Sequence, residues 1–136
     1  MISVLIDAGP IIALFDKDDQ HYERVLNYMR EFHGRLITTW PVLTEVCYML
    51  DFNLQTRLDF LDWVSDGGIE IYNLEQWQIK QIRNLMEKYA DLPADLADAT
   101  LIEAAVSLKL ESVITIDSDF QVYRLKNGKA LQNLLQ

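Results

Sequence analysis

The sequence has little of several features that mark specialised classes of protein. It contains one cysteine, Cys47, with three prolines and five glycines in 136 residues. A single cysteine excludes an internal disulfide and a cysteine-rich metal site, and it fits a reducing compartment. Because half of the residues are apolar and 24% are charged, a disordered or low-complexity chain is also excluded. We therefore expect a globular protein.

The chain also lacks a long apolar run. The longest runs, such as residues 11–15, are far shorter than the roughly 20 residues that a membrane-spanning helix needs. The N-terminus shows no basic region followed by an apolar stretch and a cleavage site. We expect a soluble, cytoplasmic protein with no membrane contact. Its length fits one core, so we predict a single domain over residues 1–136.

Basic residues are few. Twelve lysines and arginines stand against 21 acidic residues, which gives a net charge of −9. No global positive field attracts nucleic acid, so a polyanion has to be bound locally. Residues 120–136 contain no acid, and Arg124, Lys126 and Lys129 lie there. These three are candidate RNA contacts, although a solvated tail with ordinary surface charge explains the pattern equally well.

Short apolar segments alternate with amphipathic ones along the chain. We expect strands at residues 2–6, 36–39, 69–72 and 113–116. Helices are expected at residues 10–15, 22–32 (ended by Gly34), 41–50, 56–64, 75–89 and 93–108. The alternation predicts an α/β fold with a mainly parallel central sheet flanked by helices. Ligands of such sheets bind beyond the carboxyl ends of the strands, where Asp7 and Asp117 fall.

Carboxylates interrupt four apolar stretches. They are Asp7 after ISVLI, Glu45 within PVLTEVCYML, Asp95 and Asp98 in PADLADATLIEAA, and Asp117 with Asp119 in VITIDSDF. Burying an unpaired carboxylate costs several kcal/mol, and converging carboxylates repel one another. None of these stretches contains a basic residue, so a divalent cation is the better counter-charge. Ligation by carboxylates alone suits Mg²⁺ or Mn²⁺, whereas zinc usually brings histidine or cysteine.

Each acid also has a purely structural interpretation. Asp7 fits a helix cap ahead of Pro10, and Asp119 fits an N-cap. Asp95 and Asp98 fit the positive end of the helix dipole that begins near Pro93. Glu45 is different, because it lies in the middle of its expected helix. We therefore favour a shared site over four separate structural explanations.

The histidines argue against a metal-free ribonuclease. That chemistry needs two titrating groups on either side of one phosphate. His21 and His33 are 12 residues apart on or beside one expected helix, which separates them by roughly 18 Å along its axis. They cannot flank the same phosphate.

The motifs together resemble those of the PIN domain family, and within it the toxin ribonucleases of bacterial VapBC-type toxin–antitoxin systems. The matching segments are DAGPIIALF, the helix bearing TEV, LPADLADATLIEAA, and ITIDSDF followed by an aromatic and basic end. The chain departs from the pattern at Ala8 and Gly9, where many members carry serine or threonine. The resemblance places the family's catalytic, metal-binding acids at Asp7, Glu45, Asp98 and Asp117, the supporting acids at Asp95 and Asp119, and a hydroxyl at Thr115.

The resemblance implies a Mg²⁺- or Mn²⁺-dependent endoribonuclease that holds one or two ions and cleaves RNA by metal-activated water. It also implies the toxin of a type II pair, with a homodimer and a small antitoxin as partner. Two alternatives remain. A metal-dependent phosphatase usually needs a second acid two residues after the first, where this chain has Gly9. An inactive PIN-fold interaction module is the other, and the retained acids argue against it.

Overall fold

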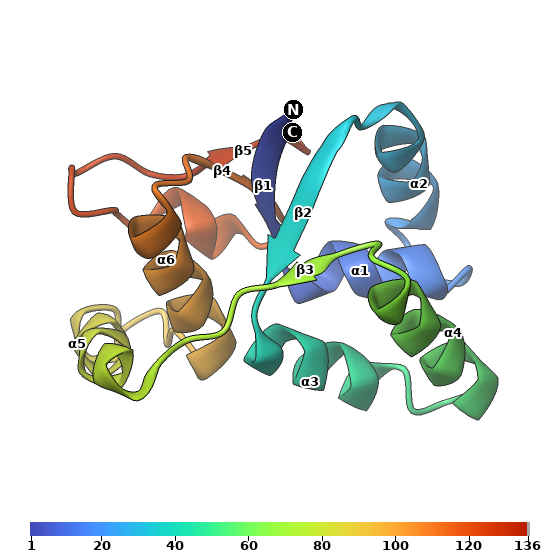
Figure 1. Cartoon of the computed structure of the whole chain (residues 1–136), viewed down its shortest axis with the longest axis horizontal. Helices are drawn as coiled ribbons and strands as arrows, with labels where there is room; N and C mark the ends of the chain where they lie inside the picture. Colours follow the sequence, from blue (N-terminus) through green and yellow to red (C-terminus); the bar gives the residue numbers. More distant parts are fainter. Residues whose placement is uncertain (136) are drawn as a thin grey trace.

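A computed structural model describes residues 1–135 and has an α/β architecture (Figure 1). One sheet contains five strands in the order β3-β2-β1-β4-β5, and every neighbouring pair is parallel. The strands are β1 (Ile2–Ile6), β2 (Gly34–Thr38), β3 (Glu70–Ile71), β4 (Ser112–Ile114) and β5 (Gln132–Asn133). The expectation of an α/β fold with a mainly parallel sheet is confirmed.

Helices cover both faces of the sheet. Figure 1 shows α1, α2 and α4 on one side of the sheet and α5 and α6 on the other, with α3 beneath the carboxyl ends of the strands, where it contacts both α1 and α6. None of the helices within residues 1–135 combines the length and the apolar character that a bilayer span needs. The helices are α1 (Ala8–Phe15), α2 (Tyr22–Glu31), α3 (Trp40–Met49), α4 (Leu54–Ser65), α5 (Ile79–Lys88) and α6 (Leu96–Leu108), with 3₁₀ helices η1 (Gln76–Gln78) and η2 (Ser118–Gln121).

The central strand β1 is buried on both faces. Val4, Leu5 and Ile6 are all fully buried, as expected of an apolar run in a parallel sheet that is covered on each side. Thr38, the last residue of β2, donates its hydroxyl to the carbonyl of Ile6, the last residue of β1, at 2.9 Å. This bond joins the ends of β1 and β2 and so fixes the position of Asp7, the residue that follows β1.

The prediction that Gly34 ends the helix at residues 22–32 is wrong. Helix α2 stops at Glu31, and Gly34 begins β2 opposite Ile2 of β1. A Cβ at position 34 would lie 2.7 Å from the Phe32 ring and 2.8 Å from the Ile2 carbonyl oxygen. The glycine is therefore explained by the close approach of β1.

Helix α3 is buried on one side and exposed on the other. Val42, Val46 and Leu50 are buried, whereas Tyr48 is 72% and Met49 is 51% exposed. An apolar side chain that faces the core and one that faces solvent look the same in the sequence, so periodicity did not separate them.

Candidate metal centre

Asp7 is the first residue beyond β1, and it caps α1. Its Oδ1 accepts the backbone N–H of Ala8 at 2.8 Å, and its Oδ2 accepts the Thr115 hydroxyl at 3.0 Å. The carboxylate is 6% exposed. Burial raises the pKa of Asp7 to about 6, and these two hydrogen bonds, together, limit the rise. The capping role that sequence alone allowed is present, and it coexists with a place in the acidic site.

Asp98 lies in the first turn of α6, where it is 9% exposed. Its Oδ2 accepts the hydroxyl of Tyr123 at 2.8 Å. Burial, followed by the charge of Asp7, raises the pKa of Asp98 to about 7. Tyr123 is buried beside it, and burial together with its bond to the carboxylate raises the pKa of the phenol. The phenol therefore stays protonated and serves Asp98 as a permanent donor.

Thr115 organises the carbonyl end of β4. Its hydroxyl donates to Asp7 and accepts the backbone N–H of Asp117 at 3.0 Å. On its backbone, Thr115 accepts from the Asn133 amide at 2.9 Å and donates to the Asn133 side-chain oxygen at 3.3 Å. The expected hydroxyl at Thr115 thus contacts the first acid directly. A hydroxyl at position 8 or 9 is not needed for that contact.

Three carboxylates converge at this edge of the sheet. Ligand oxygens of Asp7, Asp98 and Asp117 all lie within 4.8 Å of one another. The two ion pairs found within residues 1–135 join Arg35 to Glu70 and Arg83 to Glu87, so neither neutralises the cluster. Burial is the main cause of the raised pKa values of Asp7 and Asp98, and the charges of neighbouring carboxylates add to the rise.

Glu45 lies on α3, half-buried and outside this trio. Partial burial raises its pKa, and the charges of Asp95, Asp98 and Asp117 raise it further, in that order. Glu45 and Asp95 line the same hollow, of about 570 Å³, beside Trp40. Glu45 is therefore close enough to be affected by the charges of Asp98 and Asp117.

The two acids expected in supporting positions differ in their surroundings. Asp95 is exposed and caps α6, since its Oδ1 accepts the N–H of Asp98 at 3.0 Å. Asp119 is half-buried in η2, where its N–H donates to the Oδ1 of Asp117 at 2.9 Å. Asp117, rather than Asp119, is the N-cap of that short helix.

The residues present fit a divalent cation. The three nearest ligand groups are all carboxylates, and the described part of the chain offers the cluster no lysine or arginine partner. Hard oxygen donors of this kind suit Mg²⁺ or Mn²⁺. A cation bound by Asp7, Asp98 and Asp117 would offset the cost of burying these charges and their mutual repulsion.

The expected RNA contacts lie on the segment after η2. Nη1 of Arg124 donates to the carbonyls of Gln121, Val122 and Tyr123, at 2.6, 2.9 and 3.0 Å. The guanidinium is therefore folded back on its own chain, which sequence could not show. Lys126 and Lys129 are exposed.

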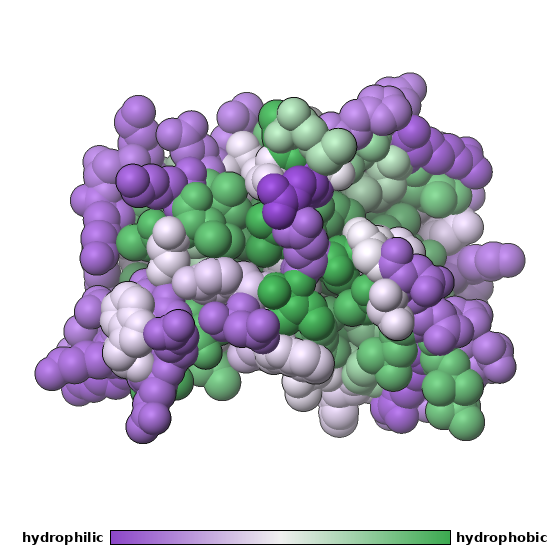
Figure 2. All heavy atoms as spheres, in the orientation of Figure 1, coloured by the Kyte–Doolittle hydropathy of each residue, from purple (hydrophilic) through white to green (hydrophobic). Residues whose placement is uncertain are grey.

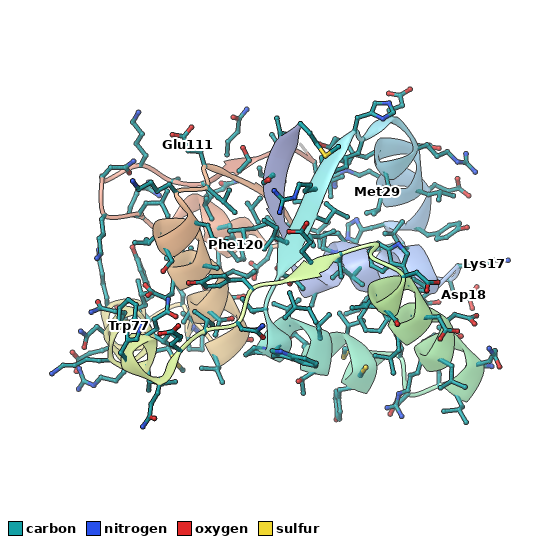
Figure 3. The ribbon with its side chains drawn as sticks, viewed as in Figure 1. Lys17, Asp18, Met29, Trp77, Glu111 and Phe120 are labelled. Atoms are coloured by element: carbon teal, nitrogen blue, oxygen red, sulfur yellow. The ribbon has the colours of Figure 1, made fainter. Side chains whose placement is uncertain are left out.

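Sequence reasoning missed Tyr123 and Asn133. Tyr123 follows Asp119 by four residues in a stretch without acids, and the aromatic after ITIDSDF was the only signal for it. Asn133 belongs to β5, a two-residue strand with no detectable periodicity. Phe120, which Figure 3 labels beside α6, is buried and packs edge-on against the Tyr123 ring, with ring centroids 5.1 Å apart.

Comparison with known proteins identifies the family. A profile of the PIN domain matches residues 4–125, which covers most of the chain and includes the three converging aspartates. The chain belongs to the PIN domain family. Among PIN domain proteins it is similar to Ribonuclease VapC26 of Mycobacterium tuberculosis, with 22% identity over 116 residues, covering 84% of this chain and 86% of that protein.

Two solved structures share this fold. The crystal structure of Mycobacterium tuberculosis VapC20, described as a sarcin-ricin loop cleaving toxin, superposes with a TM-score of 0.80 at 12% identity. That match covers 88% of this chain and 93% of the other. VapBC2 from Rickettsia felis, solved bound to a DNA fragment from its promoter, gives a TM-score of 0.60 at 13% identity, with 89% and 92% covered.

Proposed function

We propose that this PIN domain protein is an endoribonuclease that depends on Mg²⁺ or Mn²⁺ and acts as the toxin of a type II toxin–antitoxin pair. The observation that carries the proposal is the convergence of Asp7, Asp98 and Asp117 within 4.8 Å, with no basic partner among the described residues. The similarity to a VapC ribonuclease over 84% of the chain supports RNA as the substrate.

The chain's own residues would hold and orient one or two ions. Asp7, Asp98 and Asp117 are the first ligands, and Glu45 and Asp95 stand at the rim. Such a cation supplies a water of lowered pKa and stabilises the charge that develops on a phosphodiester. Thr115 donates its hydroxyl to Asp7 and keeps that carboxylate in place. Tyr123 stays protonated and donates its hydroxyl to Asp98. Asp119 donates its N–H to Asp117 and so fixes that carboxylate.

The RNA would reach this acidic site through local contacts. The net charge of −9 opposes binding of a polyanion, whereas Arg124, Lys126 and Lys129 lie just after Tyr123. We include these three residues in the proposal as phosphate contacts. Because Arg124 is tied to backbone carbonyls, it offers a fixed charge rather than a mobile one.

An exposed apolar face supports the proposed protein partners. Helices α3 and α4 and the turn between them expose several large apolar side chains, and Figure 2 shows apolar atoms at the surface there. They are Tyr48, Met49, Phe52, Leu54, Leu58 and Leu61. Apolar surface of this extent usually marks contact with another protein. We propose that a small antitoxin and a second copy of the chain are its partners, in the cytoplasm.

The experiment compares RNA cleavage by the parent, Asp98→Asn, Asp117→Asn and a control, Asp18→Asn. Asp18 is exposed on the loop after α1, far from the cluster (Figure 3). We expect the parent and the control to cleave RNA in Mg²⁺ or Mn²⁺ and not in EDTA. In the two site variants, the loss of one metal ligand should lower the cleavage rate by at least about 100-fold.

The transcript ends identify the reaction. Hydrolysis with a metal-activated water is expected to leave new 5′-phosphate ends, which can be mapped across the transcriptome after induction. Unchanged cleavage by Asp98→Asn, or equal cleavage in EDTA, would refute the metal-dependent mechanism. Release of inorganic phosphate from monoesters without RNA cleavage would favour the phosphatase alternative.

A further inference from the structure

Four basic side chains gather around two adjoining hollows on the side of the molecule formed by α5, α6 and residues 124–128. Lys88, Arg124 and Lys126 line the first hollow, of about 390 Å³. Lys109 and Lys126 line the second, of about 270 Å³. We call these four residues the basic cradle. It combines two positions after Tyr123 with two that are distant in sequence, Lys88 at the end of α5 and Lys109 at the end of α6.

The cradle is positively charged in an acidic protein. Neither ion pair within residues 1–135 involves any of its four residues. Two acids also line the hollows, Glu103 and Glu111. Glu103 is buried and accepts the Gln78 amide at 3.1 Å, so it is directed into the protein. The surface of the two hollows therefore presents four positive charges against the single exposed charge of Glu111.

Contacts hold two of the four cradle residues, Lys88 and Arg124, in place. The backbone N–H of Arg124 donates to the Tyr89 hydroxyl at 2.8 Å. The Tyr89 ring packs edge-on against Tyr123, with centroids 5.0 Å apart, and the Lys88 ammonium lies 5.2 Å from the Tyr89 centroid. Cations that are held in place lose less conformational entropy when they bind a ligand.

The cradle begins close to the acidic cluster and extends away from it along α6. Ile102 lines the first hollow and follows Asp98 by four residues on α6, which places it about 6 Å further along the helix axis. From the other side, Arg124 is adjacent to Tyr123, whose hydroxyl binds Asp98. A nucleic acid strand with one phosphate at the cluster would therefore bring neighbouring phosphates to the cradle.

We propose that the basic cradle binds backbone phosphates of the RNA on one side of the bond that is cut. The proposal rests on the proposed function, and it extends the RNA-binding surface to Lys88 and Lys109. An acidic cluster repels the flanking phosphates of its own substrate, so a cleaving site of this charge needs compensating cations nearby. The cradle supplies them along α6, from the hollow beside Ile102 to Lys109, roughly 16 Å beyond Asp98 along the helix axis.

The test compares two double variants with the same change in net charge. Lys88→Ala with Lys126→Ala removes two cradle charges, and Lys17→Ala with Lys80→Ala removes two exposed lysines that line neither hollow. Lys17 projects on the opposite side of the molecule from α5 and α6 (Figure 3). Lys109 is left unchanged, so that the cradle variant and the control each lose two positive charges.

Binding of a fluorescent single-stranded RNA is measured from 50 to 400 mM salt without divalent ions, so that no cleavage occurs. We expect the cradle variant to flatten the slope of log K against log salt by about 1.4, which is roughly 0.7 for each lost phosphate contact. Affinity at 0.1 M salt should fall on the order of tenfold, and the Lys17 and Lys80 control should change it by less than threefold. Replacing Lys88 and Lys126 by arginine instead of alanine should keep the slope of the parent.

Each contrary result has a separate meaning. Equal losses in the two double variants would overturn the cradle, because net charge alone would then explain the binding. A loss for duplex DNA of the same length but not for RNA would assign the surface to DNA and also overturn it. RNA binding through the cradle without any cleavage in Mg²⁺ would refute the proposed nuclease while leaving the cradle intact. Cleavage that is insensitive to the cradle variant, with unchanged binding, would refute the cradle alone.

Discussion

The hydroxyl of Tyr123 donates to the Asp98 carboxylate at 2.8 Å, in a part of the protein where both side chains are buried. This bond favours the ionised form of Asp98 against the burial that raises its pKa. Tyr123 thus acts on the acidic cluster through Asp98, and we regard it as a positioning residue.

Tyr123→Phe is expected to move the acidic limb of the cleavage-rate profile to higher pH. Loss of the donor raises the pKa of Asp98 further, so a higher pH is needed to ionise it for cation binding. Stability should fall by about 1.5–3 kcal/mol, the usual cost of a lost hydrogen bond to a charged group. Tyr22→Phe is the control. A lower rate with an unshifted pH profile would show that Tyr123 has only a packing role.

Without divalent ions, the protein is expected to lose stability as the pH rises from about 4 to 7. Asp7 and Asp98 have folded pKa values of about 6 and 7 against 3.8 in the unfolded chain, so the folded state binds more protons across this window. Urea unfolding at pH 4.5, 6 and 8 in EDTA measures the effect.

Asp98→Asn isolates the contribution of one group to that pH dependence. The amide cannot ionise, so at pH 8 the variant should be more stable than the parent by on the order of 2 kcal/mol without metal. The difference should shrink toward pH 4.5. A variant that is equally destabilised at every pH would mean that folding does not disfavour ionisation of Asp98.

Addition of Mg²⁺ or Mn²⁺ is expected to raise the melting temperature of the parent, since a ligand that binds only the folded state stabilises it by mass action. Calcium should stabilise too, with little cleavage. Glu45→Gln should show a smaller shift, because one carboxylate at the rim of the cluster is lost at constant volume. A shift equal to that of the parent would place Glu45 outside the ligand set.

Thr115→Val is expected to lower both stability and metal affinity, whereas Thr115→Ser should keep most of each. The valine removes the donor to Asp7 and the acceptor of the Asp117 N–H, and these bonds are buried. The cost should be about 2–3 kcal/mol, measured by urea unfolding. A valine variant that matches the parent in stability and metal affinity would show that the β-branched shape matters and the hydroxyl does not.

The sequence predicted those parts of the site that follow from strand ends. Asp7 and Asp117 could be placed together because parallel strands end at one edge of a sheet. Asp98 could be added because its helix faces the core. The link from Tyr123 to Asp98 could not, since it depends on how η2 turns after Asp117.

Surface features were predicted less well. The exposure of Tyr48 and Met49 was missed because an apolar side chain shows no difference between a core and a surface that faces a partner. Arg124 looked like a free cation, yet its guanidinium binds three carbonyls of its own segment. Lys88 and Lys109 join Lys126 only through the packing of α5 against α6.

Asp7 meets Thr115 across a sequence separation of 108 residues. During translation the ribosome delivers Asp7 early, whereas Thr115, Tyr123 and Asn133 emerge only after most of the domain. The acidic cluster therefore cannot close on a nascent chain that still holds residues 115–133 in the exit tunnel. For the proposed nuclease, this order keeps the chain inert toward the ribosomal and transfer RNAs beside which it is made, until those last contacts have formed.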